Sequence, residues 1–507
     1  MDNIVSYLGY WTDNGSYYYY NPIKNKTLSE TLIEVKNHLE KLKVPIKYYN
    51  IDSWWYIKEV AHWKRKLLGN LGRILGGGLY GGTITWEPDP NYMHESVDQL
   101  SKDLNNVFVA HNRWFSSKTI YQKDFNFYIE NGRAICLDES FWDLIMQNCQ
   151  KWNIITYEQD WMHNQFESFS ILRNEVYNVD KWLKVMSMAA KKYNRTIQYC
   201  MSNPGMILTS VKLDNVSYAR TSGDYHPRWP RIYDYRFFTQ TNLLAYGLRL
   251  WPFKDVFRST CEGRINGEKQ PELMALVSCL SCGPVGFGDK IGKVGVDILA
   301  KTCRTDGLLI KPDAPLRVTD RMFIPHNKYY ISYTYSDFGL KRWYYVLINK
   351  LKIKQPKDKT FKLEDIDANE NKYIVFDYFK KTISVIDKEK SLVYNLKGQD
   401  YKYLILAPIL QEGFSIIGDI SKFVPINFKT FKSINKIGNK YQISIENILD
   451  ETMIIYLYNQ NKIKKILLDN SELAINYPEN NQNSELCFVK IEFNKNYEKM
   501  LEIELFS

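Results

Sequence analysis

Two acidic residues stand at the ends of apolar runs in the first half of the chain. In ARTSGDYHP (219–227), Arg220 and Asp224 follow the alternating run VSYA, which places a cation beside a carboxylate. Asp160 ends a second apolar run, in IITYEQDW (154–161), 64 residues before Asp224. Two carboxylates at two strand ends are the minimum equipment for hydrolysing a glycosidic bond, provided that the fold brings them together.

The elements around these acids predict an α/β fold. The first 320 residues alternate strand-like runs with helical periods, which indicates βα units and a parallel sheet. The candidate strands are 4–11, 45–52, 106–112, 153–160, 196–202, 216–222, 247–253 and 275–287. Eight repeats with polar residues at the strand ends favour a (β/α)8 TIM barrel, whose catalytic face is formed by those ends. An open doubly wound sheet is the alternative.

Two amphipathic segments predict helices between the strands. In 27–43, leucines and a valine recur at three- and four-residue steps, and Thr27 and Glu30 have the spacing of a capping box. The segment 178–193 has a similar apolar stripe. The Gly-rich segment 69–82 lacks the Gly-Lys-Ser/Thr ending of a phosphate-binding loop, so we expect a loop over the barrel face.

From about residue 325 the pattern changes to short alternating runs separated by Asn, Asp, Lys and Gly. This pattern is typical of an antiparallel β-sandwich. We therefore predict a catalytic barrel over 1–323, followed by a C-terminal β-sandwich domain over 324–507. The second domain holds few candidate catalytic groups, so we interpret it as a packing module with at most a minor carbohydrate contact.

Charge and hydropathy exclude several classes of partner. The net charge of +10 is spread over both halves, which gives no support to nucleic-acid binding. No run of about 20 apolar residues is present, so no membrane span is expected. The start, MDNIVSYLGYW, lacks a basic region followed by an apolar one. We expect a cytoplasmic protein, or a secreted or lysosomal one if the N-terminus is incomplete.

The eight cysteines do not predict a metal site. Cys279 and Cys282 form a single CxxC motif in an apolar run, with no second motif or paired histidine nearby. Buried free thiols are the expected state, and we expect no metal and no other cofactor.

In chain order, the strand ends carry YYNIDSWW (48–55), YEQDW (157–161), YCMS (199–202), RTSGDYHP (220–227) and SCGPVGFGDKIG (281–292). This series resembles the clan of (β/α)8 retaining glycoside hydrolases that contains the α-galactosidases and the plant raffinose synthases. The similarity covers most of residues 5–323 and is weak over the C-terminal domain. It implies a double displacement on α-linked sugars, with α-galactosides as the first expectation.

The resemblance also implies a role for each matching residue. Asp160 would be the nucleophile and Asp224 the general acid/base. The implied substrate-binding residues are Asp52 for sugar hydroxyls, Trp54 or Trp55 to shape the pocket, and Arg220 to contact the substrate or set the charge of Asp224. Beyond the family pattern, we add Cys200, at the pocket floor, and Glu158 as candidate substrate-binding residues.

Two departures from the family pattern concern these residues. Glu158 stands where family members carry a lysine that would bind a hydroxyl and lower the pKa of the nucleophile. Carboxylates that lie close together raise one another's pKa. Ser53 replaces the second aspartate of the strand-two pair, which changes the hydrogen bonding at one sugar position.

Three functions follow as alternatives. The first is a retaining glycosidase acting on α-linked sugars, and the second is a galactosyl transferase like raffinose synthase. The third, suggested by Glu158 and Ser53, is a catalytically inactive barrel that only binds carbohydrate. The expected partner is an oligosaccharide or glycoside in each case, and the sequence does not predict an oligomeric state.

Overall fold

The structure is a computed structural model of the chain, and it divides into two compact units. It describes residues 3–17, 21–60, 81–225, 232–261, 268–323, 329–339, 341–350, 360–366, 368–389, 391–393, 401–449, 451–478, 485–494 and 497–506. The barrel unit comprises Met1–Pro230, Leu244–Ser278 and Gly283–Leu299, and the β unit comprises Arg231–Leu243, Cys279–Cys282 and Ala300–Ser507. The predicted domain boundary at residue 323 stays a prediction, because compactness alone does not establish independent folding.

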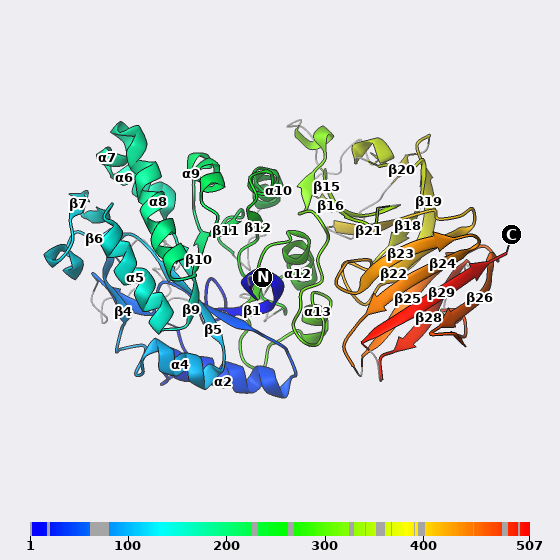
Figure 1. The fold of residues 1–507 in the computed structure, drawn as a ribbon, viewed down its shortest axis with the longest axis horizontal. Coiled ribbons are helices and arrows are strands. Elements are labelled where there is room, and N and C mark those ends of the chain that lie inside the picture. Colours follow the sequence, from blue (N-terminus) through cyan, green and yellow to red (C-terminus); the bar gives the residue numbers. More distant parts are fainter. Residues whose placement is uncertain are drawn as a thin grey trace. The chain divides into compact units, whose positions relative to one another are not determined.

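The barrel unit contains an eight-stranded parallel sheet with the order β12-β11-β10-β9-β5-β2-β1-β13 (Figure 1). Its strands are β1 (Leu8–Trp11), β2 (Tyr48–Ile51), β5 (Val107–Asn112), β9 (Ile154–Gln159), β10 (Thr196–Tyr199), β11 (Val216–Arg220), β12 (Trp251–Phe253) and β13 (Val285–Phe287). A parallel bridge between Phe257 and Phe287 connects the two ends of the sheet. The predicted (β/α)8 barrel is therefore confirmed.

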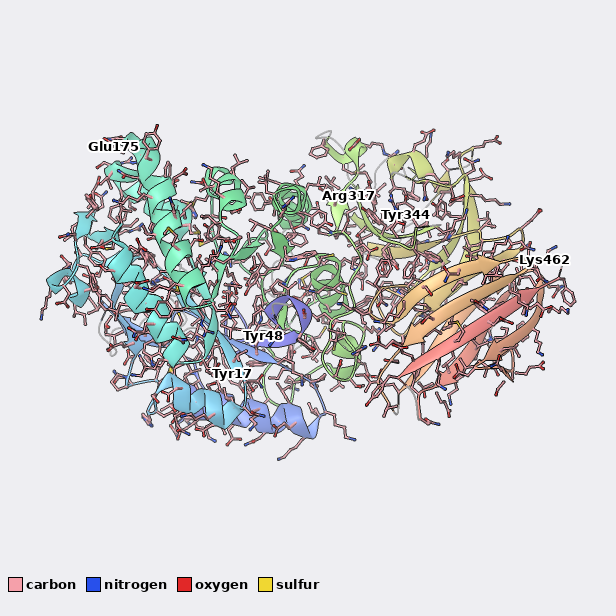
Figure 2. All side chains as sticks on the ribbon, viewed as in Figure 1. Tyr17, Tyr48, Glu175, Arg317, Tyr344 and Lys462 are labelled. Atoms are coloured by element: carbon pink, nitrogen blue, oxygen red, sulfur yellow. The ribbon has the colours of Figure 1, made fainter. Side chains whose placement is uncertain are left out.

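Aromatic side chains fill the interior of the barrel at β1, β2 and β13. Tyr48, which is labelled in Figure 2, is buried, as is Trp11. The Trp11 indole Nε1 donates a hydrogen bond to the Tyr48 hydroxyl at 3.0 Å. A Cβ on Gly286 would lie 2.0 Å from the Trp11 ring, and a Cβ on Gly9 would lie 2.2 Å from the Tyr48 ring. Glycine at these two positions leaves the volume that the large rings occupy.

The α-helices in the described part of the chain are α1 (Asn3–Ser6), α2 (Leu28–Lys41), α4 (Val97–Leu104), α5 (Glu139–Lys151), α6 (Met162–Ser168), α7 (Ser170–Asn174), α8 (Val176–Lys192), α9 (Pro204–Thr209), α10 (Ile232–Gly247), α12 (Pro271–Leu280) and α13 (Val296–Ala300). The predicted capping box at α2 is confirmed. Thr27 Oγ1 accepts from the Glu30 N–H at 3.2 Å, and Glu30 Oε2 accepts from the Thr27 N–H at 2.6 Å. The second predicted helix is α8.

The last strand prediction is wrong over most of its length. The run 275–287 begins inside α12, and only Val285–Phe287 forms a strand, β13. A continuous apolar run fits a buried helix as well as a buried strand, so its periodicity cannot separate the two. The first run is similar, because α1 (Asn3–Ser6) precedes β1.

An inserted five-stranded sheet, which the sequence did not predict, is built from the segments that follow β2 and β5. Its order is β3-β4-β6-β8-β7, and its strands are β3 (Tyr56–Lys58), β4 (Thr83–Pro88), β6 (Phe115–Ser116), β7 (Phe127–Glu130) and β8 (Arg133–Cys136). The Gly-rich segment predicted as a loop lies outside the described residues up to residue 80. This sheet supplies Tyr56 to the candidate active site.

The β unit consists mainly of antiparallel sheets, as predicted for the C-terminal region. The largest has the order β14-β15-β16-β21-β18-β19, and the others are β22-β25-β28, β23-β24-β29-β26-β27 and β17-β20. The strands are β14 (Arg317–Val318), β15 (Tyr329–Asp337), β16 (Arg342–Lys350), β17 (Thr360–Phe361), β18 (Lys372–Asp377), β19 (Thr382–Asp387), β20 (Leu392–Val393), β21 (Tyr401–Pro408), β22 (Phe414–Asp419), β23 (Phe431–Ile437), β24 (Lys440–Glu446), β25 (Thr452–Asn459), β26 (Ile463–Leu468), β27 (Ser471–Glu472), β28 (Leu486–Glu492) and β29 (Glu498–Leu505). No helix in the described part of the chain is long and apolar enough to cross a membrane.

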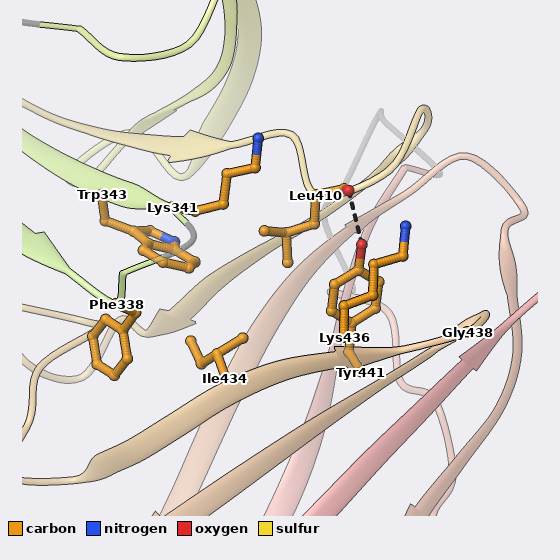
Figure 3. Close-up of a pocket in the computed structure, with 8 residues that line it drawn as sticks. All are labelled: Phe338, Lys341, Trp343, Leu410, Ile434, Lys436, Gly438 and Tyr441. Carbon is orange, nitrogen blue, oxygen red and sulfur yellow. Dashed lines mark hydrogen bonds between the residues drawn. The ribbon is translucent and has the colours of Figure 1, made fainter.

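A pocket of about 380 Å³ lies in the β unit, between the β15–β16 turn and the β23–β24 hairpin (Figure 3). Phe338, Trp343, Ile434 and Tyr441 are among the side chains that line it. The polar atoms of its aromatic rings are already used, because the Trp343 indole donates to the Ile416 carbonyl at 2.7 Å and the Tyr441 hydroxyl donates to the Leu410 carbonyl at 2.8 Å. The walls are therefore largely apolar.

Candidate active site

The predicted site residues lie at the carboxyl ends of four strands of one barrel. Glu158 is on β9, Arg220 ends β11, and Asp52, Asp160 and Cys200 directly follow β2, β9 and β10. Asp224 comes four residues after the end of β11. Because all eight strands are parallel, these ends share one rim, which is the catalytic face in barrels of this type.

The Asp160 carboxylate is held by donors on both oxygens. Oδ1 accepts from the Trp161 N–H at 2.6 Å, and Oδ2 lies 3.0 Å from His111 Nε2. Trp161 has a φ of 57°, a left-handed turn at the start of α6. Burial raises the pKa of Asp160, but the hydrogen bond and charge of His111 and the charge of Arg220 outweigh burial and hold this pKa well below its usual range. Asp160 is therefore ionised at neutral pH.

His111 was not among the residues predicted from the sequence, although it lies in the third strand-like run. It belongs to β5 and is 2 % exposed, and its Nδ1 lies 3.0 Å from the Tyr56 hydroxyl. Burial lowers its pKa, but the carboxylates of Asp52, Asp160 and Glu158 raise it above the usual value overall. The sequence held one indication of its role, which is that His111 stands near the end of a predicted strand, and other predicted strands end in the candidate carboxylates.

Glu158 is a buried acid beside these groups. It pairs in register with His111 on β5 and with Gln198 on β10, and its Oε2 accepts from Asn50 Nδ2 at 3.4 Å. Burial, together with the carboxylates of Asp160 and Asp52, raises the pKa of Glu158 to about 7 against the opposing charge of His111. Glu158 is thus protonated at mildly acidic pH and adds no full charge to the site there.

Arg220 connects two carboxylates. Its Nη2 lies 2.8 Å from Asp224 Oδ1, and its Nη1 lies 3.6 Å from Asp255 Oδ2. The Arg220 side chain is 7 % exposed, whereas half of the Asp224 side chain is open to solvent. Desolvation and the carboxylates of Asp255 and Asp160 raise the pKa of Asp224 against the charge of Arg220. Asp224 can therefore meet a ligand from solvent and favours the proton that a general acid needs.

Asp13 and Asp255 were not predicted as central residues, and they hold the rim loops together. Asp255 accepts from the Tyr225 N–H at 2.6 Å and from Asn14 Nδ2 at 3.1 Å, so it ties together the loops after β1, β11 and β12. Asp13 is buried and hydrogen-bonded to Asp255 and Asp52. Burial and then the charges of these two carboxylates raise the pKa of Asp13 well above its usual value.

The two residues that directly follow β2, Asp52 and Ser53, are buried and hydrogen-bonded. Asp52 is 7 % exposed, its N–H donates to Thr12 Oγ1 at 3.0 Å, and its Oδ1 accepts from the Ser53 N–H. Ser53 Oγ accepts from Lys58 Nζ at 3.4 Å.

The two tryptophans that follow are fully buried. The Trp55 ring packs edge-on against Trp86, with ring centres 5.1 Å apart, and the Trp54 ring packs edge-on against Tyr92. Both indoles are therefore packed against other aromatic rings, and their predicted role in shaping the pocket stays a prediction.

The Cys200 thiol completes the surroundings of Asp160. It is buried and hydrogen-bonds the Asp160 carboxylate, and burial raises its pKa well above the usual value. Cys200 is therefore a neutral donor. Within the described ranges, no group of three or more His, Cys, Asp or Glu side chains is arranged to hold a metal ion.

Comparison with known proteins finds similarity in structure only. No protein-family profile matches the chain, and no curated protein is similar in sequence. The wild-type GH27 β-L-arabinopyranosidase of Geobacillus stearothermophilus superimposes with a TM-score of 0.55 at 14 % identity, over 80 % of this chain and 97 % of that enzyme. A variant of the same enzyme in complex with arabinose gives a TM-score of 0.54 at 13 % identity, with the same coverage.

The α-galactosidase from Lactobacillus brevis gives a TM-score of 0.50 at 12 % identity, over 80 % of this chain and 55 % of that protein. These enzymes are glycoside hydrolases of the clan that the sequence motifs resemble. The predicted resemblance is thus confirmed in the fold, a (β/α)8 barrel followed by a C-terminal β domain.

Proposed function

We propose that this protein is a retaining exo-glycosidase in which Asp160 is the nucleophile and Asp224 the general acid/base. The observation that carries the proposal is that the pKa values of these two acids are shifted in opposite directions, although the charge of Arg220 acts on both. Asp160 is kept ionised by His111 and Arg220, and the pKa of Asp224 is raised. A pair of carboxyl groups with their pKa values pushed apart is what a two-step displacement requires.

The two steps follow from these protonation states. Asp160 attacks the anomeric carbon while the bond to the leaving oxygen breaks, and that oxygen takes the proton from Asp224. The glycosyl ester on Asp160 is then attacked by water, which gives its proton back to Asp224. The sugar leaves with its original anomeric configuration, and both carboxyl groups return to their starting states.

The substrate proposed is an α-D-galactoside or a β-L-arabinopyranoside. These two sugars have the same ring configuration and differ by the hydroxymethyl group on C5. The two enzymes compared above are a β-L-arabinopyranosidase and an α-galactosidase, so each is named for one of these substrates. Kinetics with 4-nitrophenyl α-D-galactopyranoside and 4-nitrophenyl β-L-arabinopyranoside therefore test one structural feature, the space for that hydroxymethyl group. Turnover of neither substrate would contradict this substrate class.

The catalytic roles are tested by Asp160→Asn and Asp224→Asn. We expect each to lower kcat/KM by at least about 10³-fold, because each removes a group that acts in the transition state. Azide should rescue both variants but give opposite products. The nucleophile variant should form the inverted glycosyl azide, and the acid/base variant should form the retained one.

The matched control is Asp180→Asn, an aspartate on α8 paired with Lys212 at 3.1 Å on the surface. It should keep the activity of the unchanged protein. Full activity in either Asp160→Asn or Asp224→Asn would remove that residue from the mechanism. Sucrose added as an acceptor separates hydrolysis, which yields free sugar, from the transferase alternative, which yields a trisaccharide.

A further inference from the structure

A buried histidine links Asp160 to a tyrosine of the inserted sheet. His111 Nε2 lies 3.0 Å from Asp160 Oδ2, and His111 Nδ1 lies 3.0 Å from the Tyr56 hydroxyl. The rings of His111 and Tyr56 are 10° from parallel, with centres 6.2 Å apart. An ionised carboxylate can only accept, so the proton between His111 and Asp160 belongs to Nε2. The Tyr56 hydroxyl either donates or accepts, so it suits the neutral and the cationic imidazole alike.

Three acidic groups from two strands act on His111. Asp52 follows β2, Glu158 lies on β9, and Asp160 follows β9. All three act on the His111 charge. On the Tyr56 side, Lys58 Nζ lies 4.8 Å from the centre of the tyrosine ring. Asp160 therefore contacts the imidazole directly, whereas Lys58 lies against the ring of Tyr56.

We propose that His111, as an imidazolium, is the positioning residue that keeps Asp160 ionised, in place of the lysine that the resemblance predicts at Glu158. His111 and Glu158 are register partners on the adjacent strands β5 and β9. In this proposal the cation lies on β5, one strand away from the position where the family pattern has a lysine, and that position on β9 holds the acid Glu158. This inference rests on the proposed function, because it assumes that Asp160 is the nucleophile.

The arrangement also explains how an acid is tolerated at Glu158. A lysine at this position and a protonated His111 would place two cations side by side in a buried site. With the cation at His111, the neighbouring position can carry a carboxyl group that is neutral at mildly acidic pH. The residues at positions 111 and 158 therefore depend on each other, because a cation on β5 allows a carboxyl group at the neighbouring position on β9.

A titration of the histidines tests the proposal without any turnover. The chain has seven histidines, and the spectrum of His111→Gln identifies the His111 signals in imidazole ¹⁵N NMR. We expect His111 to titrate above 6.5 in the unchanged protein and about 1–3 pH units lower in Asp160→Asn, because the opposite charge beside it is lost. The exposed His94 is the internal reference.

Kinetics supply a second readout that a purely structural role would not move. His111→Gln keeps an N–H donor but removes the charge. The apparent pKa of the acid limb in the pH profile of kcat/KM should therefore rise by about 1–3 units, while KM changes little. Adding Glu158→Lys to His111→Gln restores a cation on the next strand and should move the limb back. If His111→Gln does not fold, Tyr56→Phe should shift the limb in the same direction by a smaller amount.

The possible outcomes are distinct. A His111 that stays neutral, or one whose titration is the same in Asp160→Asn, overturns the inference. An acid limb in His111→Gln that coincides with that of the unchanged protein also overturns it. Full activity of Asp160→Asn would instead overturn the role of Asp160 as the nucleophile. The effect of Asp160 on the His111 titration could still be measured in that case.

Discussion

At the scale of single residues, the site contains more acids than it can ionise. Asp13, Asp52, Glu158, Asp160 and Asp255 are all buried, and the basic groups of Arg220, His111 and Lys254 act on members of this set. Like charges at close range in a site of low dielectric cannot all persist, so some carboxyl groups keep their protons. The pKa directions divide these acids accordingly, with Asp160 and Asp255 lowered and Asp13 and Glu158 raised.

A prediction about stability follows for Glu158. Its pKa is about 7 in the folded protein, against 4.5 for an ordinary glutamate. Between these pH values the folded state holds a proton that the unfolded state has lost, so stability falls as pH rises through this window. Glu158→Gln cannot ionise. We expect it to match the unchanged protein near pH 4.5 and to exceed it by about 3 kcal/mol at pH 8, as measured by urea unfolding.

The control for this measurement is Glu412→Gln, a change at an exposed glutamate. Its stability difference from the unchanged protein should be the same at both pH values. A Glu158→Gln variant whose stability runs parallel to that of the unchanged protein would show that Glu158 ionises normally in the folded state.

The sequence predicted the acids of the site but not the residues that set their protonation states, and this difference has a physical reason. Asp52, Asp160 and Asp224 follow apolar runs, and a strand end in a parallel barrel has a known position. The contact of His111 with Tyr56 joins residues 55 positions apart and depends on the inserted sheet. Asp13 acquires its role from contacts with acids on other strands. Pairings of this kind are not visible in local patterns.

At the scale of elements, strand positions were predictable and strand pairings in the insertion were not. All eight barrel strands fall within predicted runs, because buried parallel strands are continuous and apolar. In the inserted sheet, β3 has three residues and β6 has two, and β4 pairs with both although neither is close to it in the sequence. Such short segments show no periodicity that separates a strand from a loop.

The packing of β13 against β1 gives a prediction at this scale. A Cβ on Gly286 would lie within 2.0 Å of the Trp11 ring, and that ring is fixed by its hydrogen bond to Tyr48. Gly286→Ala should therefore cost about 3 kcal/mol or more, since overpacking forces both side chains and backbone to move. Chemical unfolding would measure this loss. Gly247→Ala is the control, because a Cβ there meets nothing within 4 Å.

Stability of Gly247→Ala should be unchanged or slightly higher than that of the unchanged protein. A Gly286→Ala variant of unchanged stability would mean that Trp11 does not fill the barrel interior. Gly286→Ala should also lose activity, because β1, which packs against β13, carries the rim loop that holds Asp13.

At the scale of the whole molecule, the chain combines two units with different kinds of core. In the barrel unit, parallel strands surround an interior that includes Trp11 and Tyr48. In the β unit, antiparallel sheets enclose a separate cluster that includes Tyr330, Tyr344 and Phe361. The proposed chemistry uses residues of the barrel unit alone. The change from helical to alternating patterns near residue 325 made the two kinds of core predictable from sequence.

Two cores of this kind predict two calorimetric transitions. Gly286→Ala should lower the temperature of one, and Ile443→Ala, a truncation at a fully buried position of β24, should lower the other. Ile437→Ala is the control from the same hairpin, because Ile437 is 57 % exposed. A sugar ligand binds only the folded barrel, so at 100 times its Kd it should stabilise the first transition by about 2.7 kcal/mol and leave the second in place. A single transition that all three perturbations move together would mean that the chain unfolds as one cooperative body, and the predicted division at residue 323 would then have no thermodynamic meaning.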